Sequence, residues 1–190
     1  MSGSPVYSQV LTSQKAAGTL FNTYTTAKSV LNVTELVPLA GNTLTTGSKL
    51  RVRVWGGLSN IVTTPGTVTF QIMMGSIVVW TSGALQLSTT ANTLSPFLLE
   101  AILRLDSMGA TTAAKFIGGG KVEALNVQLG AGVANPTVTD SVCMTPAGAP
   151  AVGTGFDSTI SNILDFWVGF SISNAGNGVQ VYDYTVEQLQ

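Results

Sequence analysis

Polar and apolar residues alternate along several short segments of this chain, and turn-forming residues separate those segments. In the segment 49–55 the even-numbered residues are all apolar. The odd-numbered ones are Lys49, Arg51, Arg53 and Trp55. Strict alternation is typical of a strand whose two faces meet different surroundings, because successive side chains point to opposite sides of a sheet. The chain is therefore expected to fold from β-strands.

Similar patterns predict further strands along the sequence. We expect them at 28–33, 67–74, 77–80, 96–106, 115–117, 121–127, 138–142, 164–173 and 179–187. Gly56-Gly57 is expected to end the segment 49–55, and Gly75-Ser76 fits a two-residue hairpin turn. The glycines at 118–120 leave open whether 115–127 is one bent strand or two.

Two segments carry particular interpretations. Residues 96–106 also fit a helix with Ser95 as its cap and Pro96 in its first turn, but we favour a strand, because the other segments are all β. Residues 164–173 and 179–187 are predicted to pair as an antiparallel hairpin. In that hairpin Tyr182, Tyr184 and Val186 are expected to share one face.

These strands predict an all-β chain, an antiparallel two-sheet jelly-roll or β-sandwich. Residues 1–20 show weak periodicity and are interpreted as an N-terminal arm, either loosely ordered or lying on a neighbouring subunit. Residues 21–190 then form a single domain. A long loop rich in Gly, Ala and Pro, around 130–156, is a candidate contact loop.

The chain offers few groups for chemistry. It has no histidine, one cysteine and only 9% charged residues. A Ser-His-Asp triad is therefore impossible, and Cys143 is expected to be a small buried apolar residue. We expect no catalytic residue, no cofactor and no metal site, since Asp157, Asp165 and Asp183 are isolated in the sequence. The chain is accordingly not expected to be an enzyme.

Charge and hydropathy also limit the partners. The net charge is −1, Lys and Arg are scattered, and no apolar run approaches the length of a membrane span, so we expect neither nucleic acid nor membrane as a partner. No secretory signal is expected at the N-terminus.

Five residues are candidates for contacts with a partner or another subunit: Lys49, Arg51, Arg53, Trp55 and Trp167. The three cations form either a docking stripe for an acidic surface or an outer face that keeps the protein soluble. The two tryptophans lie opposite the apolar sets of their strands. They suit either a subunit interface or packing in a covered sheet.

Parts of the chain resemble small β-rich virion proteins of tailed bacteriophages. The similar stretches are 47–57, 64–70, 97–104 and 174–182, and the resemblance extends from about Gly18 to the end. It implies a jelly-roll protein, usually trimeric, that decorates or cements a capsid or sits on a tail or fibre. It supplies no catalytic residues.

Three functions follow as hypotheses. The first is a capsid decoration or cement protein, made in the bacterial cytoplasm, that binds the major capsid protein on the virion surface as a homotrimer. The second is a tail- or fibre-associated module that binds a glycan receptor. The third is a carbohydrate-active enzyme, for which Glu100 and Glu123 are the candidate carboxylates.

Overall fold

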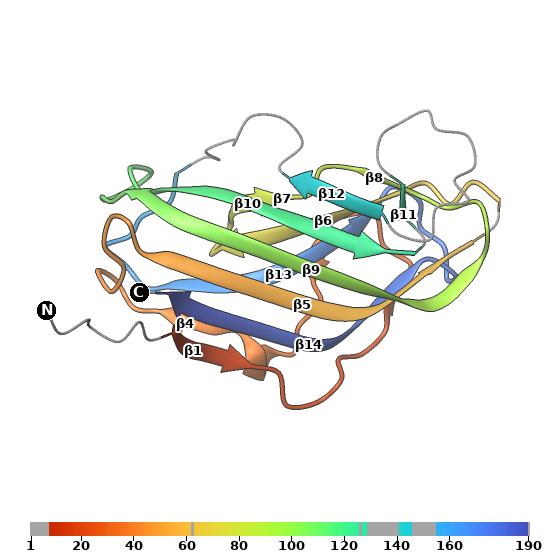
Figure 1. Ribbon diagram of the computed structural model, residues 1–190, viewed down its shortest axis with the longest axis horizontal. Helices are drawn as coiled ribbons and strands as arrows, with labels where there is room; N and C mark the ends of the chain where they lie inside the picture. Colours follow the sequence, from red (N-terminus) through yellow and green to blue (C-terminus); the bar gives the residue numbers. More distant parts are fainter. Residues whose placement is uncertain (1–7, 62, 126, 129–140, 146–154, 190) are drawn as a thin grey trace, which may run out of the picture.

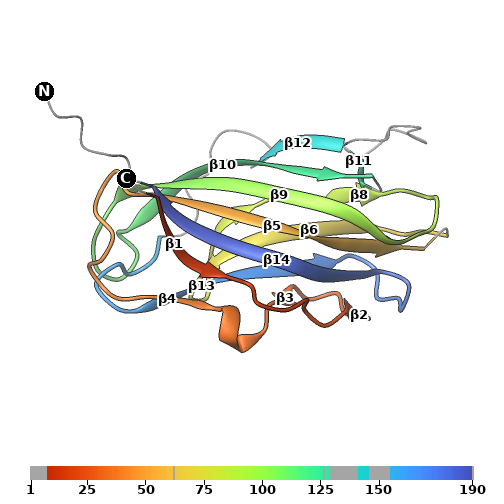
Figure 2. The same ribbon diagram turned by 60° about the horizontal axis from the view of Figure 1, so that its bottom comes forward.

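The computed structural model describes residues 8–61, 63–125, 127–128, 141–145 and 155–189. Within these residues the chain forms two antiparallel sheets that pack face to face, as the two layers in Figures 1 and 2 show. The predicted all-β, two-sheet sandwich is confirmed. In particular, residues 96–106 lie within a strand and not in a helix.

The first sheet, sheet A, faces the viewer in Figure 1. Its strands follow the order β1 (Ser8–Ser13), β14 (Gly178–Leu189), β5 (Lys49–Asn60), β9 (Asn92–Ser107), β10 (Lys115–Ala124) and β12 (Ser141–Thr145). The short β2 (Phe21–Asn22) also pairs with β14. The three long strands β14, β5 and β9 form the continuous centre of this sheet.

The second sheet, sheet B, lies behind sheet A in Figure 1. Its order is β11 (Val127–Gln128), β8 (Leu85–Leu87), β6 (Thr67–Met74), β13 (Asn162–Phe170) and β3 (Lys28–Ser29). Two further strands complete it: β4 (Val37–Leu39) pairs with β13, and β7 (Ile77–Thr81) pairs with β6. A 3-10 turn, η1 (Val33–Glu35), precedes β4.

The chain crosses repeatedly between the two sheets. It passes from β1 and β2 in sheet A to β3 and β4 in sheet B, returns for β5, and crosses again for β6, β7 and β8. It then forms β9 and β10 in sheet A, β11 in sheet B, β12 in sheet A and β13 in sheet B, and ends in sheet A with β14, which inserts between β1 and β5. This wrapping of paired strands around a two-layer core is the jelly-roll arrangement.

The alternating apolar residues fill the space between the sheets. Phe70 on β6 stacks on Phe97 on β9 with ring centroids 5.3 Å apart, and on Phe166 on β13 at 6.0 Å. Since Phe97 belongs to sheet A and the other two rings to sheet B, this stack joins the layers. Tyr184 on β14 is fully buried in the same core. Burial of these aromatic rings is a large part of what holds the two sheets together.

The predicted hairpin of 164–173 with 179–187 is wrong, because its two strands belong to different sheets. β13 pairs with β6, β3 and β4, whereas β14 pairs with β1, β2 and β5. Asn177 holds the connecting corner: its Nδ2 donates to the carbonyls of Pro65 and Ile172, and its Oδ1 accepts from the Ile61 N–H. A crossing between sheets needs the same turn residues as a hairpin, so the local pattern does not distinguish them.

The glycine pairs do not end strands. β5 continues through Gly56-Gly57 to Asn60. Both glycines are buried against neighbouring chain segments, where there is no room for a larger side chain. A Cβ at Gly56 would collide with the Gln180 carbonyl and with the ring of Phe97. β10 likewise runs unbroken through the glycines at 118–120 as a single strand. In both strands glycine allows close approach to a neighbour.

Two further positions differ from expectation. Met73, predicted to point outward, is only 4% exposed. Tyr182 does not share a face with Tyr184, because the pairing of β14 with β5 shifts register between Val181 and Asp183. One extra residue at such a bulge turns the side chain to the opposite face.

The expected N-terminal arm contains a strand. Of residues 1–20, Ser8–Ser13 form β1, which pairs with β14 at the edge of sheet A, and Leu11 packs partly against the core. The predicted strand 138–142 overlaps β12 only at residues 141–142, and 138–140 lie outside the described residues. Most of the expected loop 130–156 and the side chain of Cys143 also lie outside them.

Candidate binding surface

Sheet A presents one broad face away from the core, which we call the outer face. Strand register arranges its side chains in rows that cross β5, β9 and β10. One row holds Arg53, Glu100 and Lys121, and the next holds Trp55, Leu98 and Glu123. The outer face of sheet A thus brings together four of the five residues predicted to make contacts.

The cations at the centre of the outer face are paired with carboxylates of neighbouring strands. Arg51 Nη1 donates to Glu187 Oε2 on β14 at 3.2 Å, and its Nε lies 3.7 Å from Glu100 Oε1. Arg53 Nε lies 4.0 Å from the other oxygen of Glu100. Two of the three predicted stripe residues are therefore neutralised within the sheet, as an outer face kept soluble would be.

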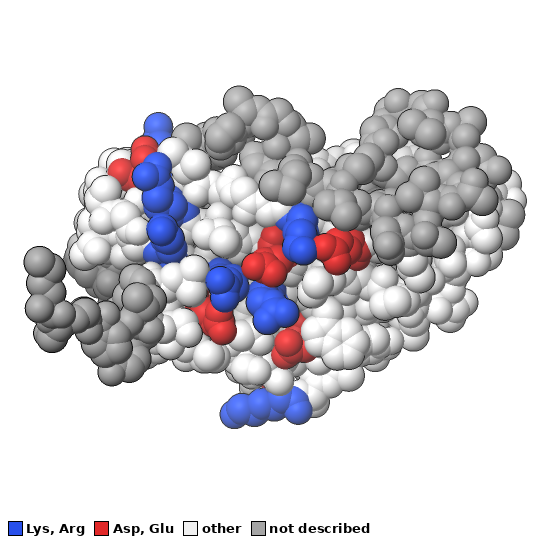
Figure 3. All heavy atoms as spheres, viewed as in Figure 1, with Lys and Arg blue, Asp and Glu red and all other residues white. Residues whose placement is uncertain are grey.

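A different set of cations lies at one end of this face. Lys49 on β5 stands directly opposite Arg104 on β9, and exposed Lys115 is at the start of β10. Arg104 bonds Asp106 at 3.1 Å, whereas no carboxylate of the described residues lies within ion-pair distance of Lys49 or Lys115. We call Lys49, Arg104 and Lys115 the basic row, in which Lys115 stands opposite Ser107, further along β9 than Arg104. Figure 3 shows Lys and Arg gathered at that end.

The basic row has an intrinsic cost. Like charges directly opposite one another on neighbouring strands repel and destabilise the pairing. Lys49 and Arg104 nevertheless occupy such a pair, and both side chains are exposed. The arrangement leaves a positive end on a chain whose net charge is −1.

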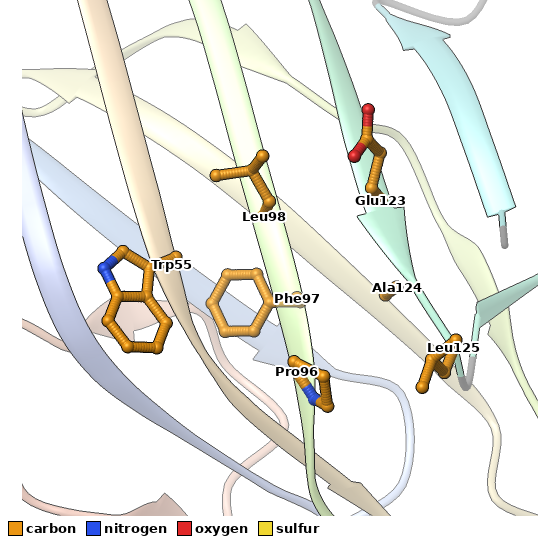
Figure 4. Close-up of a pocket in the computed structure, with 7 residues that line it drawn as sticks. All are labelled: Trp55, Pro96, Phe97, Leu98, Glu123, Ala124 and Leu125. Atoms are coloured by element: carbon orange, nitrogen blue, oxygen red, sulfur yellow. The ribbon is translucent and has the colours of Figure 1, made fainter.

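At the other end of the outer face Trp55 borders a shallow groove of about 400 Å³. In Figure 4 Trp55 projects from β5 on one side, Glu123 on β10 and Leu125 just after it lie on the other, and Pro96 and Leu98 come from β9 between them. We call this hollow the Trp55 groove. Trp55 is 46% exposed, and Tyr182 contacts it edge-on with ring centroids 5.3 Å apart.

Trp167, the fifth predicted contact residue, lies on sheet B, so the structure does not bring it to the outer face. It is half-buried, and its Nε1 donates to Asp165 Oδ2 at 2.6 Å. Ser29 and the Phe166 N–H donate to the other oxygen of Asp165. Burial raises the pKa of Asp165 above its usual value, and these hydrogen bonds act in the opposite direction.

The carboxylates considered for enzymatic or metal chemistry are used in other ways. Glu100 pairs with Arg51 and Arg53, and Lys121 Nζ donates to Glu123 Oε1 at 2.6 Å. Within the described residues no three or more His, Cys, Asp or Glu side chains gather as a metal site would require. Asp157 bonds the backbone N–H and hydroxyl of Thr159, and these bonds lower its pKa.

Three residues of this surface were not predicted from the sequence as contact residues: Arg104, Lys115 and Tyr182. Arg104 lies opposite Lys49 because of the register of β5 with β9, and Lys115 comes to the same end because β10 pairs with β9; the sequence specifies neither pairing. Tyr182 reaches Trp55 only because β14 is bulged. Alternation does place Arg104 on the polar side of its own strand, and that was the one available signal.

Comparison with known proteins gives little further guidance. No family model and no curated protein matches the chain. Among solved structures, the CBM2 module of the evolved Dit protein of Lactobacillus casei phage J-1 is similar to 81% of this chain and 68% of its own, with 11% identity and a TM-score of 0.34. The winged bean acidic lectin, solved with methyl-α-D-galactose, is similar over 98% and 100%, with 10% identity and a TM-score of 0.30.

Similarities as low as these carry no argument about what this chain binds.

Among the described residues, no helix has the length and hydropathy needed to cross a membrane.

Proposed function

We propose that this protein is a capsid decoration protein of a tailed phage, which binds the outside of the major capsid lattice as a homotrimer and stabilises it. It acts by binding and not by catalysis, as the ion pairs of Glu100 and Glu123 suggest. The resemblance of stretches such as 47–57 and 97–104 to phage virion proteins supports the assignment to a virion. The jelly-roll wrapping of the two sheets agrees with that resemblance.

The basic row carries the proposal that the outer face docks on a partner. The repulsion between Lys49 and Arg104 is relieved when an acidic surface covers both side chains. Arg51 and Arg53 pair with carboxylates of neighbouring strands, and Arg104 pairs with Asp106, whereas among the described residues Lys49 and Lys115 have no carboxylate within ion-pair distance. The expected contact on the capsid is therefore a cluster of Asp or Glu side chains facing Lys49, Arg104 and Lys115.

The test uses empty capsids assembled without this protein and the purified chain added back. We expect saturable co-sedimentation at a copy number fixed by shell symmetry, and a density of three-fold shape in electron microscopy. Bound chain also raises the temperature at which the capsids rupture, because it stabilises the state it binds. Absence of binding to these capsids would refute the proposed function.

A double charge reversal tests the basic row. Lys49→Glu combined with Arg104→Glu keeps a like-charged cross-strand pair while the sign of the surface changes; because it also removes the ion pair of Arg104 with Asp106, folding of the variant is verified by circular dichroism. We expect capsid affinity to fall at least tenfold at low salt and the wild-type affinity to decrease as salt is added. Lys15→Glu is the matched control, because Lys15 is exposed in the segment after β1. Equal loss in the control would contradict a specific role for the row.

A further inference from the structure

The Trp55 groove combines an exposed aromatic ring with charged side chains of both signs. Strand register places Trp55, Leu98 and Glu123 in one row, with Leu98 as a half-buried floor between the other two. Pro96 and Leu125 continue the apolar lining at one end. At the other end lies the row of Arg53, Glu100 and Lys121.

Trp55 is held in place while its ring stays accessible. Tyr182 packs against it from β14 with an interplanar angle of 68°. The Tyr182 side chain itself lies close over Gly57, since a Cβ at that glycine would come within 2.9 Å of the Tyr182 hydroxyl. Trp55 still keeps 46% of its surface exposed. Because Tyr182 already restricts the indole, Trp55 loses little conformational entropy when a ligand packs against it.

Polar groups surround this ring in a way that suits a ligand with many hydroxyls. Glu123 and Glu100 supply acceptor oxygens, and Lys121 and Arg53 supply donors, all on the same face. Lys121 and Glu123 are held together at 2.6 Å, so a donor and an acceptor stand side by side. Neighbouring hydroxyls of a sugar ring, each both donor and acceptor, match such a pair.

Other ligand classes fit less well. The cations beside the aromatic ring, Arg53 and Lys121, are already paired with Glu100 and Glu123, so neither is free to bind the phosphates of a nucleic acid. A volume of about 400 Å³ lies in the lower part of the range for small-molecule sites. The open, shallow shape offers an extended apolar chain little enclosure.

From these observations we propose that the Trp55 groove is a saccharide-binding site, in which a pyranose ring packs its apolar C–H face on Trp55 and directs its hydroxyls toward Glu123 and Lys121. The site goes beyond capsid decoration, and it gives the virion surface an affinity for glycans. The groove and the basic row lie at opposite ends of the outer face and share no residue.

Saturation-transfer NMR of the full chain tests this site. The probes are methyl glycosides of glucose, galactose and rhamnose, together with N-acetylglucosamine, each at millimolar concentration. We expect transfer to the ring C–H protons of at least one probe and a shift of the Trp55 indole N–H signal. No transfer to any of the four probes would overturn the proposal.

Three variants locate the binding. Trp55→Ala is expected to weaken saccharide binding at least tenfold, Trp55→Phe to retain part of it, and Glu123→Gln to weaken it several-fold. The matched control is Ile102→Ala, which removes another exposed apolar side chain of the outer face outside this groove. Unchanged binding by Trp55→Ala, with folding verified by circular dichroism, would also overturn the proposal.

The two proposals fail separately. The Lys49→Glu/Arg104→Glu variant is expected to bind saccharide normally, and Trp55→Ala to bind capsids normally. Saccharide binding without capsid binding refutes decoration alone, and the reverse result refutes the saccharide site alone.

Discussion

Individual side chains on this protein take their roles from neighbours that are distant in sequence. Arg51 is neutralised by Glu187 from β14, and Asp165 is held by Ser29 from β3. Of these three cations, Lys49 is the one for which the described part of the chain supplies no ion-pair partner, and alternation does not distinguish it from Arg51 or Arg53. Alternation assigned all three cations correctly to one face, but their partners depend on which strands lie alongside.

The buried carboxylate of Asp165 gives stability a pH dependence of known sign. Burial raises its folded-state pKa above the unfolded value. The contribution of Asp165 to the free energy of unfolding is therefore fully present below its unfolded-state pKa, and it is lost as pH rises through the raised folded-state pKa. We expect the difference in unfolding free energy between wild type and Asp165→Asn to fall as pH increases through that window. Urea denaturation between pH 3 and 8 measures this difference in unfolding free energy, which changes by at most about 1.4 kcal/mol per pH unit.

Asp157→Asn is the control of opposite sign. Hydrogen bonds from Thr159 lower the pKa of Asp157, so its contribution is present above the unfolded pKa and is lost as pH falls through the folded one. Parallel pH profiles for the two variants would contradict the assigned role of Asp165.

At the level of strands, glycine has two different meanings in sheet A. Gly56 is buried where β5 meets Gln180 on one side and Phe97 on the other, whereas Gly119 on β10 has open space where a Cβ would be. The expectation that Gly56-Gly57 ends a strand was wrong because it considered only the flexibility of glycine. The glycines are needed for tight packing between strands.

A matched pair of alanine substitutions tests this distinction. Gly56→Ala is expected to lower the free energy of unfolding by about 1–3 kcal/mol, because the new methyl group overlaps backbone and ring atoms. Gly119→Ala is expected to change it little, or to raise it by about 0.5 kcal/mol, since alanine loses less backbone entropy. Urea unfolding curves provide the comparison, and equal losses in both variants would disprove it.

For the whole molecule, the decisive feature is the insertion of β14 between β1 and β5. The N-terminal segment and the last strand thereby become neighbours, with further backbone bonds from Gln14 to Tyr184 and from Gly18 to Val181. β1 is uncharged along Ser8–Ser13 and shows weak alternation, because it is an edge strand that contributes only Leu11 to the core margin. That is why this segment resembles an arm in the sequence.

Deleting residues 1–14 separates the two interpretations of this segment. If β1 is part of the sheet, we expect the truncated chain to lose about 2 kcal/mol, which corresponds to a decrease in Tm of about 4–8 °C. It should also aggregate more readily, because the edge of β14 is uncovered. Differential scanning calorimetry and light scattering measure both effects. An unchanged Tm with a loss of oligomers would instead indicate an arm that serves a neighbouring subunit.

The sequence by itself determined the fold class, most strand positions and the inward residues of β5, β6 and β13, because alternation is a local property that burial in a two-layer core enforces. It also placed Lys49, Arg51, Arg53 and Trp55 on one surface. Only the tertiary structure decided that β13 and β14 lie in different sheets, that β1 borders β14, and that Trp55 faces Glu123 across Leu98. These facts depend on pairing between strands far apart in the chain, and the free energy that selects one register resides in contacts that no single segment contains.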